Sequence, residues 1–310
     1  MGRGGPPGLG GGWAMTTQPL SNPFALADPA VLKGLLRRHG FTWKKRLGQN
    51  FLIDARVLAR LIDAAELRPD DGVFEVGPGA GVVTRLAATR ARRVVAVEKD
   101  ACLRPVLAEV LAGLPHVEVV FADVLKLRLP DVWGRFHDCA GVKVIANLPY
   151  YVTTPILFHL LEAGVRMDSI VVMVQREVAQ RLAAAPGSKD YGALSVAVQY
   201  RCSVERVLQV RAGAFLPPPE VDSAVVRLRV RGEPPVAVRD EQMFFRVVRA
   251  AFATRRKTLA NALTGGLEWS KELCAAVLAR AGVDGGRRGE TLSLQEFAAV
   301  ADAWAALTAT

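Results

Sequence analysis

Residues 147–151 (Asn-Leu-Pro-Tyr-Tyr) could bind and orient a planar amine. They follow the apolar run 142–146, which predicts a buried strand, so they fall at the edge where α/β sheets bind ligands. Pro149 restricts its own backbone and that of the residue before it, which holds the Asn147 side chain and the nearby carbonyls in place. These oxygens accept from amine hydrogens, while Tyr150 can stack on the attached ring. An isolated turn of this kind more often packs its aromatic ring inward, so a binding role for these residues depends on the motifs in the rest of the sequence.

A glycine-rich loop provides a second candidate binding element at residues 77–81 (Gly-Pro-Gly-Ala-Gly). The apolar run 73–76 predicts a strand before it, and residues 82–89 predict a helix after it. Such a unit lets a ligand approach the backbone, because glycine has no Cβ. Dinucleotide enzymes have similar units. The GxGxG spacing and Glu75, two residues before the first glycine, resemble a methyltransferase motif more than the NAD fingerprint.

Two acidic residues follow the next predicted strands of the sheet. Glu98 ends the run 94–97, where a carboxylate can accept from both hydroxyls of a ribose. Asp123 follows the run 117–121 and could accept from the exocyclic amine of an adenine. Either acid alone could simply cap a helix. Acids or an amide at three successive strand ends, together with the first loop glycine, outline an adenosyl pocket made of Gly77, Glu98, Asp123 and Asn147.

In this order, the motifs resemble those of the ribosomal RNA adenine dimethyltransferases, from about Leu47 to Leu263. Residues 49–52 (Gln-Asn-Phe-Leu) match the first cofactor motif of that family, and residues 215–223 match an Fx(P)PPxVxS motif that closes its target-base pocket. The resemblance implies that S-adenosyl-L-methionine is bound by Asn50, Leu52, Gly77, Glu98, Asp123 and Asn147. It also implies that the target base is held by Asn147, Leu148, Pro149, Tyr150 and Phe215.

Phe215 admits two interpretations. The resemblance places its ring opposite Tyr150, stacked on the target base, and the three following prolines would present it on a stiff extended segment. Alternatively, the segment is a proline-rich connection with Phe215 in the hydrophobic core.

The activity implied by the resemblance is dimethylation of N6 on two adjacent adenosines, in a hairpin loop near the 3′ end of 16S rRNA. The expected partner is 16S rRNA within an assembling small ribosomal subunit. A related alternative is a 23S rRNA adenine-N6 methyltransferase that confers macrolide resistance. A non-enzymatic alternative is an assembly checkpoint or a transcription-factor-like relative that uses only its basic surface. The intact residues 147–150, Glu98 and Asp123 favour an active enzyme.

The alternation of predicted strands and helices indicates an α/β domain over residues 28–232, and the resemblance implies a Rossmann-like class I methyltransferase fold. We expect residues 1–27, rich in glycine and proline at the start, to be a disordered extension. A Pro/Gly-rich change at residues 231–235 predicts the boundary of a small all-helical domain, residues 233–310, that binds RNA or the ribosome. Its helices are predicted at residues 241–252, 257–263, 271–281 and 293–307.

Basic residues could contact the phosphate backbone of an RNA, and the net charge of +10 makes a polyanionic partner plausible. Solvated charge is the competing interpretation of such runs. The candidate RNA-binding residues form two stretches: Lys44, Lys45 and Arg46, and Arg255, Arg256 and Lys257.

Other classes of protein lack their characteristic residues. Four widely spaced cysteines argue against a zinc site or a disulfide framework and are typical of a reducing cytosol, so we expect a cytoplasmic protein without a metal. No apolar run is long enough to cross a membrane. GxSxG, HExxH and P-loop motifs are absent. We expect a monomer.

Overall fold

The computed structural model describes residues 22–44 and 47–308. Most of the predicted N-terminal extension therefore lies outside the described residues. Its last part is ordered, because a 3-10 turn at Ala25–Ala27 packs Leu26 into the hydrophobic core. The described chain thus begins to fold before residue 28. Helix α1 (Pro29–Arg38) follows, and the Asp28 side chain caps it by accepting from the backbone N–H of Ala30.

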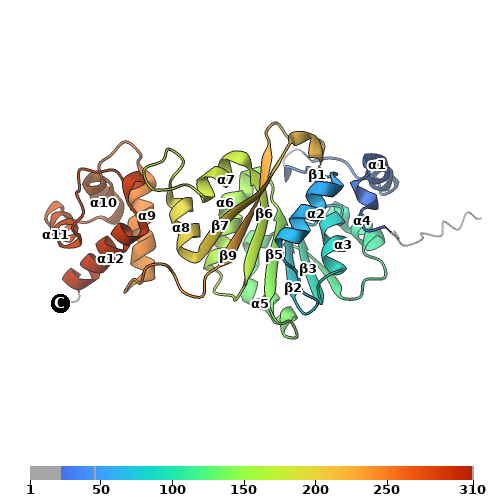
Figure 1. The fold of residues 1–310 in the computed structure, drawn as a ribbon, viewed down its shortest axis with the longest axis horizontal. Coiled ribbons are helices and arrows are strands. Elements are labelled where there is room, and N and C mark those ends of the chain that lie inside the picture. The colour runs from blue at the N-terminus through green and yellow to red at the C-terminus, as the bar shows by residue number, and fades with distance from the viewer. Residues whose placement is uncertain (1–21, 45–46, 309–310) are drawn as a thin grey trace, which may run out of the picture.

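A seven-stranded mixed sheet forms the centre of the molecule, in the order β4-β3-β2-β5-β6-β9-β7 (Figure 1). The five strands from β4 to β6 are parallel, and β9 and β7 are antiparallel to their neighbours. The bounds are β2 (Gly72–Val76), β3 (Arg93–Glu98), β4 (Val117–Phe121), β5 (Val142–Asn147), β6 (Ser169–Gln175), β7 (Cys202–Val210) and β9 (Ser223–Val230).

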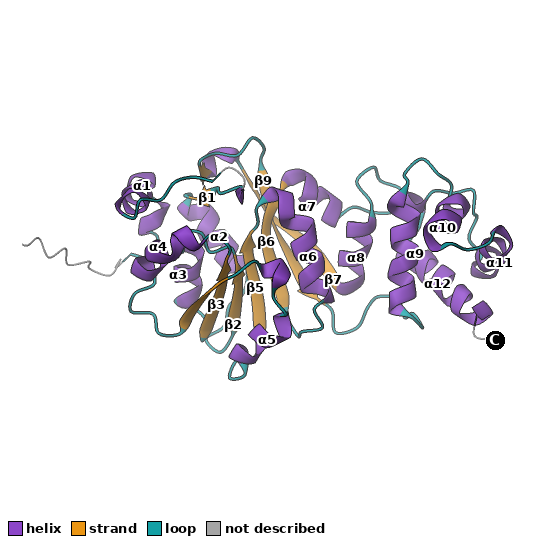
Figure 2. Ribbon diagram, turned by 180° about the vertical axis from the view of Figure 1, so that it is seen from behind, coloured by secondary structure: helices purple, strands orange, loops and turns teal. Residues whose placement is uncertain are grey.

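Helices cover both faces of this sheet (Figure 2). Successive strand residues point to opposite faces, so Val73 and Val94 belong to one core cluster while Phe74 and Val95 belong to another. The first cluster lies under α1, α2 (Ala55–Ala64), α3 (Val82–Ala88) and α4 (Arg104–Val110). The second lies under α5 (Leu129–Trp133), α6 (Thr153–Glu162), α7 (Arg176–Leu182) and α8 (Ala193–Arg201).

The predicted strands and helices of this domain are confirmed to within a few residues. Two features have no clear signal in the sequence. One is β7, an edge strand of mostly exposed and half-buried residues, in which a register shift between Arg206 and Leu208 breaks the alternation. The other is a two-stranded sheet in which β1 (Phe51–Leu52) pairs antiparallel with β8 (Phe215–Leu216), joining residues far apart in the chain.

Four helices form the C-terminal end of the chain, at the opposite end of the molecule from α1 (Figure 1). The predicted boundary at residue 232 falls in the loop between β9 and α9. A third core cluster joins these helices to α8, where the rings of Tyr200 and Phe244 stack 4.7 Å apart. None of the helices in the described ranges is long and apolar enough to cross a membrane. The bounds are α9 (Glu241–Ala253), α10 (Leu259–Leu267), α11 (Lys271–Ala281) and α12 (Leu294–Thr308).

Candidate active site

A large cavity opens at the carboxyl ends of the central parallel strands, with a volume of about 1180 Å³ including the part open to solvent. β2 leads into α3 on one face of the sheet, whereas β5 leads into α6 on the other. The crevice between the two strands is therefore a topological switch point, the usual ligand site of such sheets. All the predicted cofactor-binding and catalytic residues line this cavity: Asn50, Leu52, Gly77, Glu98, Asp123, Asn147, Leu148, Pro149, Tyr150 and Phe215.

The glycine loop after β2 forms one side of the cavity. Gly77 and Gly79 have positive φ angles of 73° and 58°, a region that favours glycine. The Gly77 N–H donates to the Val97 carbonyl at 3.0 Å, which ties the loop to β3. A Cβ on Gly79 would lie only 2.8 Å from the ring of Phe51. The loop therefore needs glycine both for its backbone and for the aromatic ring packed on it.

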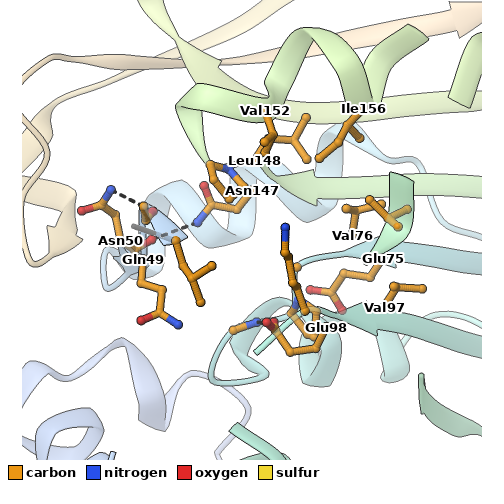
Figure 3. Close-up of a pocket in the computed structure, with 18 of the residues that line it drawn as sticks. Gln49, Asn50, Glu75, Val76, Val97, Glu98, Asn147, Leu148, Val152 and Ile156 are labelled. Atoms are coloured by element: carbon orange, nitrogen blue, oxygen red, sulfur yellow. Dashed lines mark hydrogen bonds between the residues drawn. The ribbon is translucent and has the colours of Figure 1, made fainter. Parts of the chain in front are cut away.

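Two buried carboxyl groups face the cavity opposite Asn147 and Leu148 (Figure 3). Glu98 is only 7% exposed, and its carboxylate accepts from the backbone N–H groups of Gly79 at 3.1 Å and Asp100 at 2.7 Å. Burial raises the pKa of Glu98. Burial raises the pKa of Glu75 further, to about 8, and its Oε2 has no hydrogen-bond partner among the described residues. Glu75 is therefore mostly protonated at neutral pH, whereas the backbone donors around Glu98 favour its ionised form.

Asp123 follows β4 and holds two partners. One carboxylate oxygen accepts from the Leu125 N–H at 3.1 Å, capping a 3-10 turn, and the other pairs with the Lys99 ammonium at 2.9 Å. The bond from Lys99 lowers the pKa of Asp123. A carboxylate has room for a further hydrogen bond, so Asp123 can still accept from a ligand amine in the cavity.

Asn147, the last residue of β5, presents an oriented amide to the cavity. Its Nδ2 donates to the Asn50 carbonyl at 3.2 Å, which leaves Oδ1 as an acceptor (Figure 3). The Pro149 carbonyl is occupied, because it accepts from the Val152 N–H and the Thr153 hydroxyl. The Leu148 carbonyl accepts no hydrogen bond from the described residues. The available acceptors are therefore Asn147 Oδ1 and the Leu148 carbonyl, rather than both carbonyls of the Leu-Pro pair.

The two aromatic residues assigned to the base differ in exposure. Tyr150 is half-buried, and its hydroxyl lies 2.7 Å from the hydroxyl of the fully buried Ser223 at the start of β9. Phe215 is only 3% exposed and packs in the core opposite Leu52 of β1. It also lines the cavity, so it combines both sequence interpretations: a core residue whose ring forms part of the cavity wall. Ser223 belongs to the recognised motif, but its role was not predicted.

Residues 47–52, here called the covering segment, line another part of the cavity. Gly48 lies against the Pro149 and Tyr151 side chains, because a Cβ there would be 3.4 Å from each. Asp100, only 3% exposed, anchors the segment: its carboxylate accepts from Gln49 Nε2 at 2.8 Å and from Lys44 Nζ at 2.6 Å. Sequence reasoning missed Asp100, whose only signal was its position two residues after Glu98.

The basic stretches predicted to bind RNA are not all described. Lys45 and Arg46 lie outside the described residues, and Lys44 is engaged with Asp100. Arg255, Arg256 and Lys257 are exposed in the loop between α9 and α10. Arg255 donates to the Lys189 carbonyl at 2.8 Å, which fixes part of this loop against the larger domain.

Solved structures share this arrangement. A dimethyladenosine transferase from Plasmodium falciparum matches 81% of the chain and 95% of its own length with a TM-score of 0.67 and 24% identity. The 23S rRNA methyltransferase ErmE matches 82% of the chain and 99% of its own length with a TM-score of 0.61 and 31% identity. The fold and the switch-point cavity define a Rossmann-like class I methyltransferase.

The sequence comparisons are more specific. The model of the family "Ribosomal RNA adenine dimethylase" matches residues 40–300. Over 282 residues, the chain is 50% identical to Ribosomal RNA small subunit methyltransferase A of Bacillus cytotoxicus, covering 90% of this chain and 97% of that protein. The Bacillus mycoides protein of the same name is 49% identical over the same coverage. The chain therefore belongs to the ribosomal RNA adenine dimethylase family.

Proposed function

We propose that the protein uses S-adenosyl-L-methionine to dimethylate N6 of two adjacent adenosines, in a hairpin loop near the 3′ end of 16S rRNA in an assembling small ribosomal subunit. The observation that carries this proposal is the geometry at the end of β5. There the amide of Asn147 is oriented by Asn50, and its free oxygen faces a cavity that also holds the predicted cofactor residues.

The residues of the cavity suit S-adenosyl-L-methionine. Buried Glu98 can accept from ribose hydroxyls, Asp123 can accept from the adenine amine, and the positive-φ glycines leave room for close approach to the backbone. When bound, this cofactor supplies an electrophilic methyl group. The Glu75 carboxyl group, whose Oε2 has no hydrogen-bond partner among the described residues, adds a polar group that a ligand can bond to.

The protein's task in the transfer is to make an exocyclic amine nucleophilic. The N6 lone pair is delocalised into the adenine ring, so the planar amine reacts poorly. Asn147 Oδ1 and the Leu148 carbonyl accept from its hydrogens, favour a pyramidal nitrogen and stabilise the positive charge that develops on it. A strong base is unnecessary, because the methylated nitrogen is acidic enough to lose its proton to water.

The target base must leave its stack to reach these acceptors, which costs a few kcal/mol and least in a loop. Tyr150 is held by Ser223 and can stack on the extruded base, with Phe215 forming the opposite wall. The bond to Ser223 holds the end of the tyrosine side chain in place, so the ring stays beside the cavity and can stack on the base while its amine faces Asn147.

The small-subunit substrate is favoured over the alternatives. The chain is 50% identical to the small-subunit methyltransferase of Bacillus cytotoxicus, compared with 31% identity to the 23S rRNA methyltransferase ErmE. The non-enzymatic alternative leaves unexplained why Glu98, Asp123 and Asn147 all line one cavity.

Asn147→Ala tests the proposal. We expect kcat to fall by about 10²–10³-fold, the size typical of losing one group that stabilises transition-state charge, with substrate affinity nearly unchanged. In contrast, Phe215→Ala should weaken capture of the base and let monomethyladenosine accumulate. Mass spectrometry of nucleosides from digested small-subunit rRNA measures both. Full dimethylation at the wild-type rate by Asn147→Ala would show that the target base binds elsewhere.

The loop between α9 and α10 is proposed as an RNA contact. Charge reversal at Arg256 and Lys257 should weaken small-subunit binding and make its dependence on salt less steep, by about 0.7–0.9 in log–log slope for each phosphate that the protein no longer neutralises. Cofactor affinity should stay unchanged, because neither residue lines the cavity. An unaltered salt slope would identify the loop as solvated charge only.

A further inference from the structure

A second hollow lies beside the active-site cavity and is not used by the mechanism above. This groove has a volume of about 780 Å³, including its open part. It shares Gly48, Gln49, Asn50 and Tyr150 with the active-site cavity, so the two hollows adjoin at these residues. Its remaining lining residues are Trp43, Lys44, Gln175, Pro217, Pro218, Pro219, Glu220 and Val221.

Trp43 gives the groove a large aromatic wall. Its ring packs 5.0 Å from Phe51 at a tilt and 5.5 Å from Phe41 edge-on, which fixes its orientation. The side chain is nevertheless 42% exposed, unusual for a tryptophan that is held on one side by two other rings. The other apolar surface comes from the three consecutive prolines and from Val221, which is 46% exposed. A flat, apolar guest would bury both surfaces.

Gln175 supplies a free polar group in the same groove. It ends β6 and pairs in register with Ser223, the residue whose hydroxyl meets Tyr150. The Gln175 side-chain amide has no hydrogen-bond partner among the described residues. An amide can donate and accept at once, which matches the edge of an adenine.

The charges around the groove suit a base better than a phosphate. Lys44 lines it, but its ammonium is engaged with Asp100, and Glu220 adds a negative charge. An anionic group would therefore meet no free cation from the described lining residues. A neutral aromatic base would find a stacking surface and an amide.

We propose that this groove binds the base of the nucleotide next to the target adenosine, stacked on Trp43 with its edge on Gln175. The inference rests on the proposed function, since the shared Tyr150 wall places a neighbouring base here only if the target adenosine occupies the first cavity. Because the two modified adenosines are adjacent, one of them can occupy the groove while the other is methylated.

The test uses the full-length protein and unmethylated small ribosomal subunits in which one of the two adjacent adenosines is replaced by uridine, a weak stacking base. For the wild-type enzyme, KM for the remaining adenosine should rise when its neighbour is uridine, on the 5′ side, the 3′ side or both. Trp43→Ala should raise KM on unsubstituted subunits by about five- to one-hundred-fold, the effect of losing one base–aromatic stack, with kcat nearly unchanged. It should also abolish the difference between adenosine and uridine neighbours.

Three controls separate stacking from packing. Phe41→Leu removes one of the rings that orient Trp43 without lining the groove, so it should raise KM much less than Trp43→Ala and keep the neighbour effect. Trp43→Phe should restore most of the affinity. Gln175→Ala should keep the stacking effect but lose the preference for adenosine over guanosine as the neighbour. Calorimetry should show unchanged affinity for S-adenosylhomocysteine in each variant.

The proposal is overturned if Trp43→Ala keeps the wild-type KM, or if it still distinguishes adenosine from uridine neighbours as the wild type does. These outcomes are independent of the test of the active site. If Asn147→Ala loses activity while Trp43→Ala behaves like the wild type, only the proposed role of the groove is rejected. Wild-type activity in Asn147→Ala would reject the placement of the target base itself.

Discussion

The two walls of the active-site cavity are built in different ways. One wall, here called the sheet edge, consists of the carboxyl ends of the parallel strands and carries Glu98 and Asn147. Their strands, β3 and β5, are each paired with a neighbouring strand on both sides. The covering segment has only a two-residue strand and a few polar contacts: Asn50 with Asn147, and Gln49 with Asp100. Opening the sheet edge would break the core of the domain. Opening the covering segment would break a two-residue strand and a few hydrogen bonds and would expose Phe51 and Leu52.

Both walls carry residues that are proposed to bind the cofactor. Glu98, Asp123 and Asn147, proposed to recognise the cofactor, lie on the wall that is built from strand ends. Asn50 and Leu52, also proposed to bind it, lie on the covering segment. Lys44 and Gln49 meet at Asp100, and the Asp100 N–H donates to Glu98. Asp100 therefore connects the covering segment to the sheet edge.

The largest effect is expected on the sheet edge, from Glu98→Ala. Losing two charge-assisted hydrogen bonds to the ribose should weaken cofactor binding by about 100-fold or more. Two backbone N–H groups, of Gly79 and Asp100, also lose their acceptor. Glu98→Gln keeps one acceptor oxygen and should lose less affinity. Calorimetry with S-adenosylhomocysteine checks both, and unchanged affinity in a folded Glu98→Ala variant would remove this residue from the cofactor site.

A smaller effect is expected on the covering segment, from Asp100→Asn. Burial alone would raise the pKa of Asp100, but bonds from Lys44 and Gln49 outweigh it and lower the pKa, so the native group is a carboxylate at neutral pH. The amide cannot hold both donors equally well. We expect kcat/KM to fall about tenfold, the result of losing a charged hydrogen bond of about 1.4 kcal/mol.

Hydrogen exchange sharpens this prediction. The backbone of residues 47–52 should exchange faster in Asp100→Asn, with the exchange of β2 and β5 unchanged. The matched control is Asp138→Asn, which breaks a surface pair with Arg92 and Arg93 and should alter neither the exchange of the covering segment nor catalysis. Equal protection of residues 47–52 in the Asp100 variant and the wild type would contradict the proposed link between the two walls.

The smallest effect concerns stability, through Glu75. In the folded protein the pKa of Glu75 is about 8, above the ordinary value of 4.5. Between pH 4.5 and pH 8, Glu75 is therefore protonated in the folded state and ionised in the unfolded state. The stability that Glu75 contributes is complete below about pH 4.5 and is lost as the pH rises through 8. Glu75→Gln cannot lose this proton, so its melting temperature should match the wild type near pH 5 and exceed it by ~3 °C or more at pH 8.

Thermal melts of both proteins across this pH range measure the difference. If the melting temperatures of the two proteins depend on pH in the same way, then Glu75 has an ordinary pKa and water reaches its carboxyl group in the folded protein. A bound cationic ligand should reduce the difference, because it favours the ionised carboxylate.

The amino-acid sequence predicted the cavity residues at the strand ends because of one property of parallel sheets, whereas Asn50, Leu52 and Phe215 were predicted from the family resemblance. Carboxyl ends of parallel strands meet at one edge, so residues that follow successive buried runs are brought together whatever lies between them. Glu98, Asp123 and Asn147 could be chosen on this ground from local patterns alone. The cap of α2 depends on local sequence in the same way, because the Asp54 side chain accepts from the backbone N–H groups of Arg56 and Val57, two and three residues ahead.

Only the tertiary structure decided how these residues are oriented and enclosed. The bonds from Asn147 to Asn50 and from Tyr150 to Ser223 join residues that are 97 and 73 positions apart. Lys44 is just as basic in the sequence as its neighbours, yet its ammonium is paired with Asp100, 56 positions away. Hydrophobic periodicity records which face of a strand or helix is buried, but it carries no information about which distant polar group a side chain will meet. That pairing depends on the packing of the whole domain.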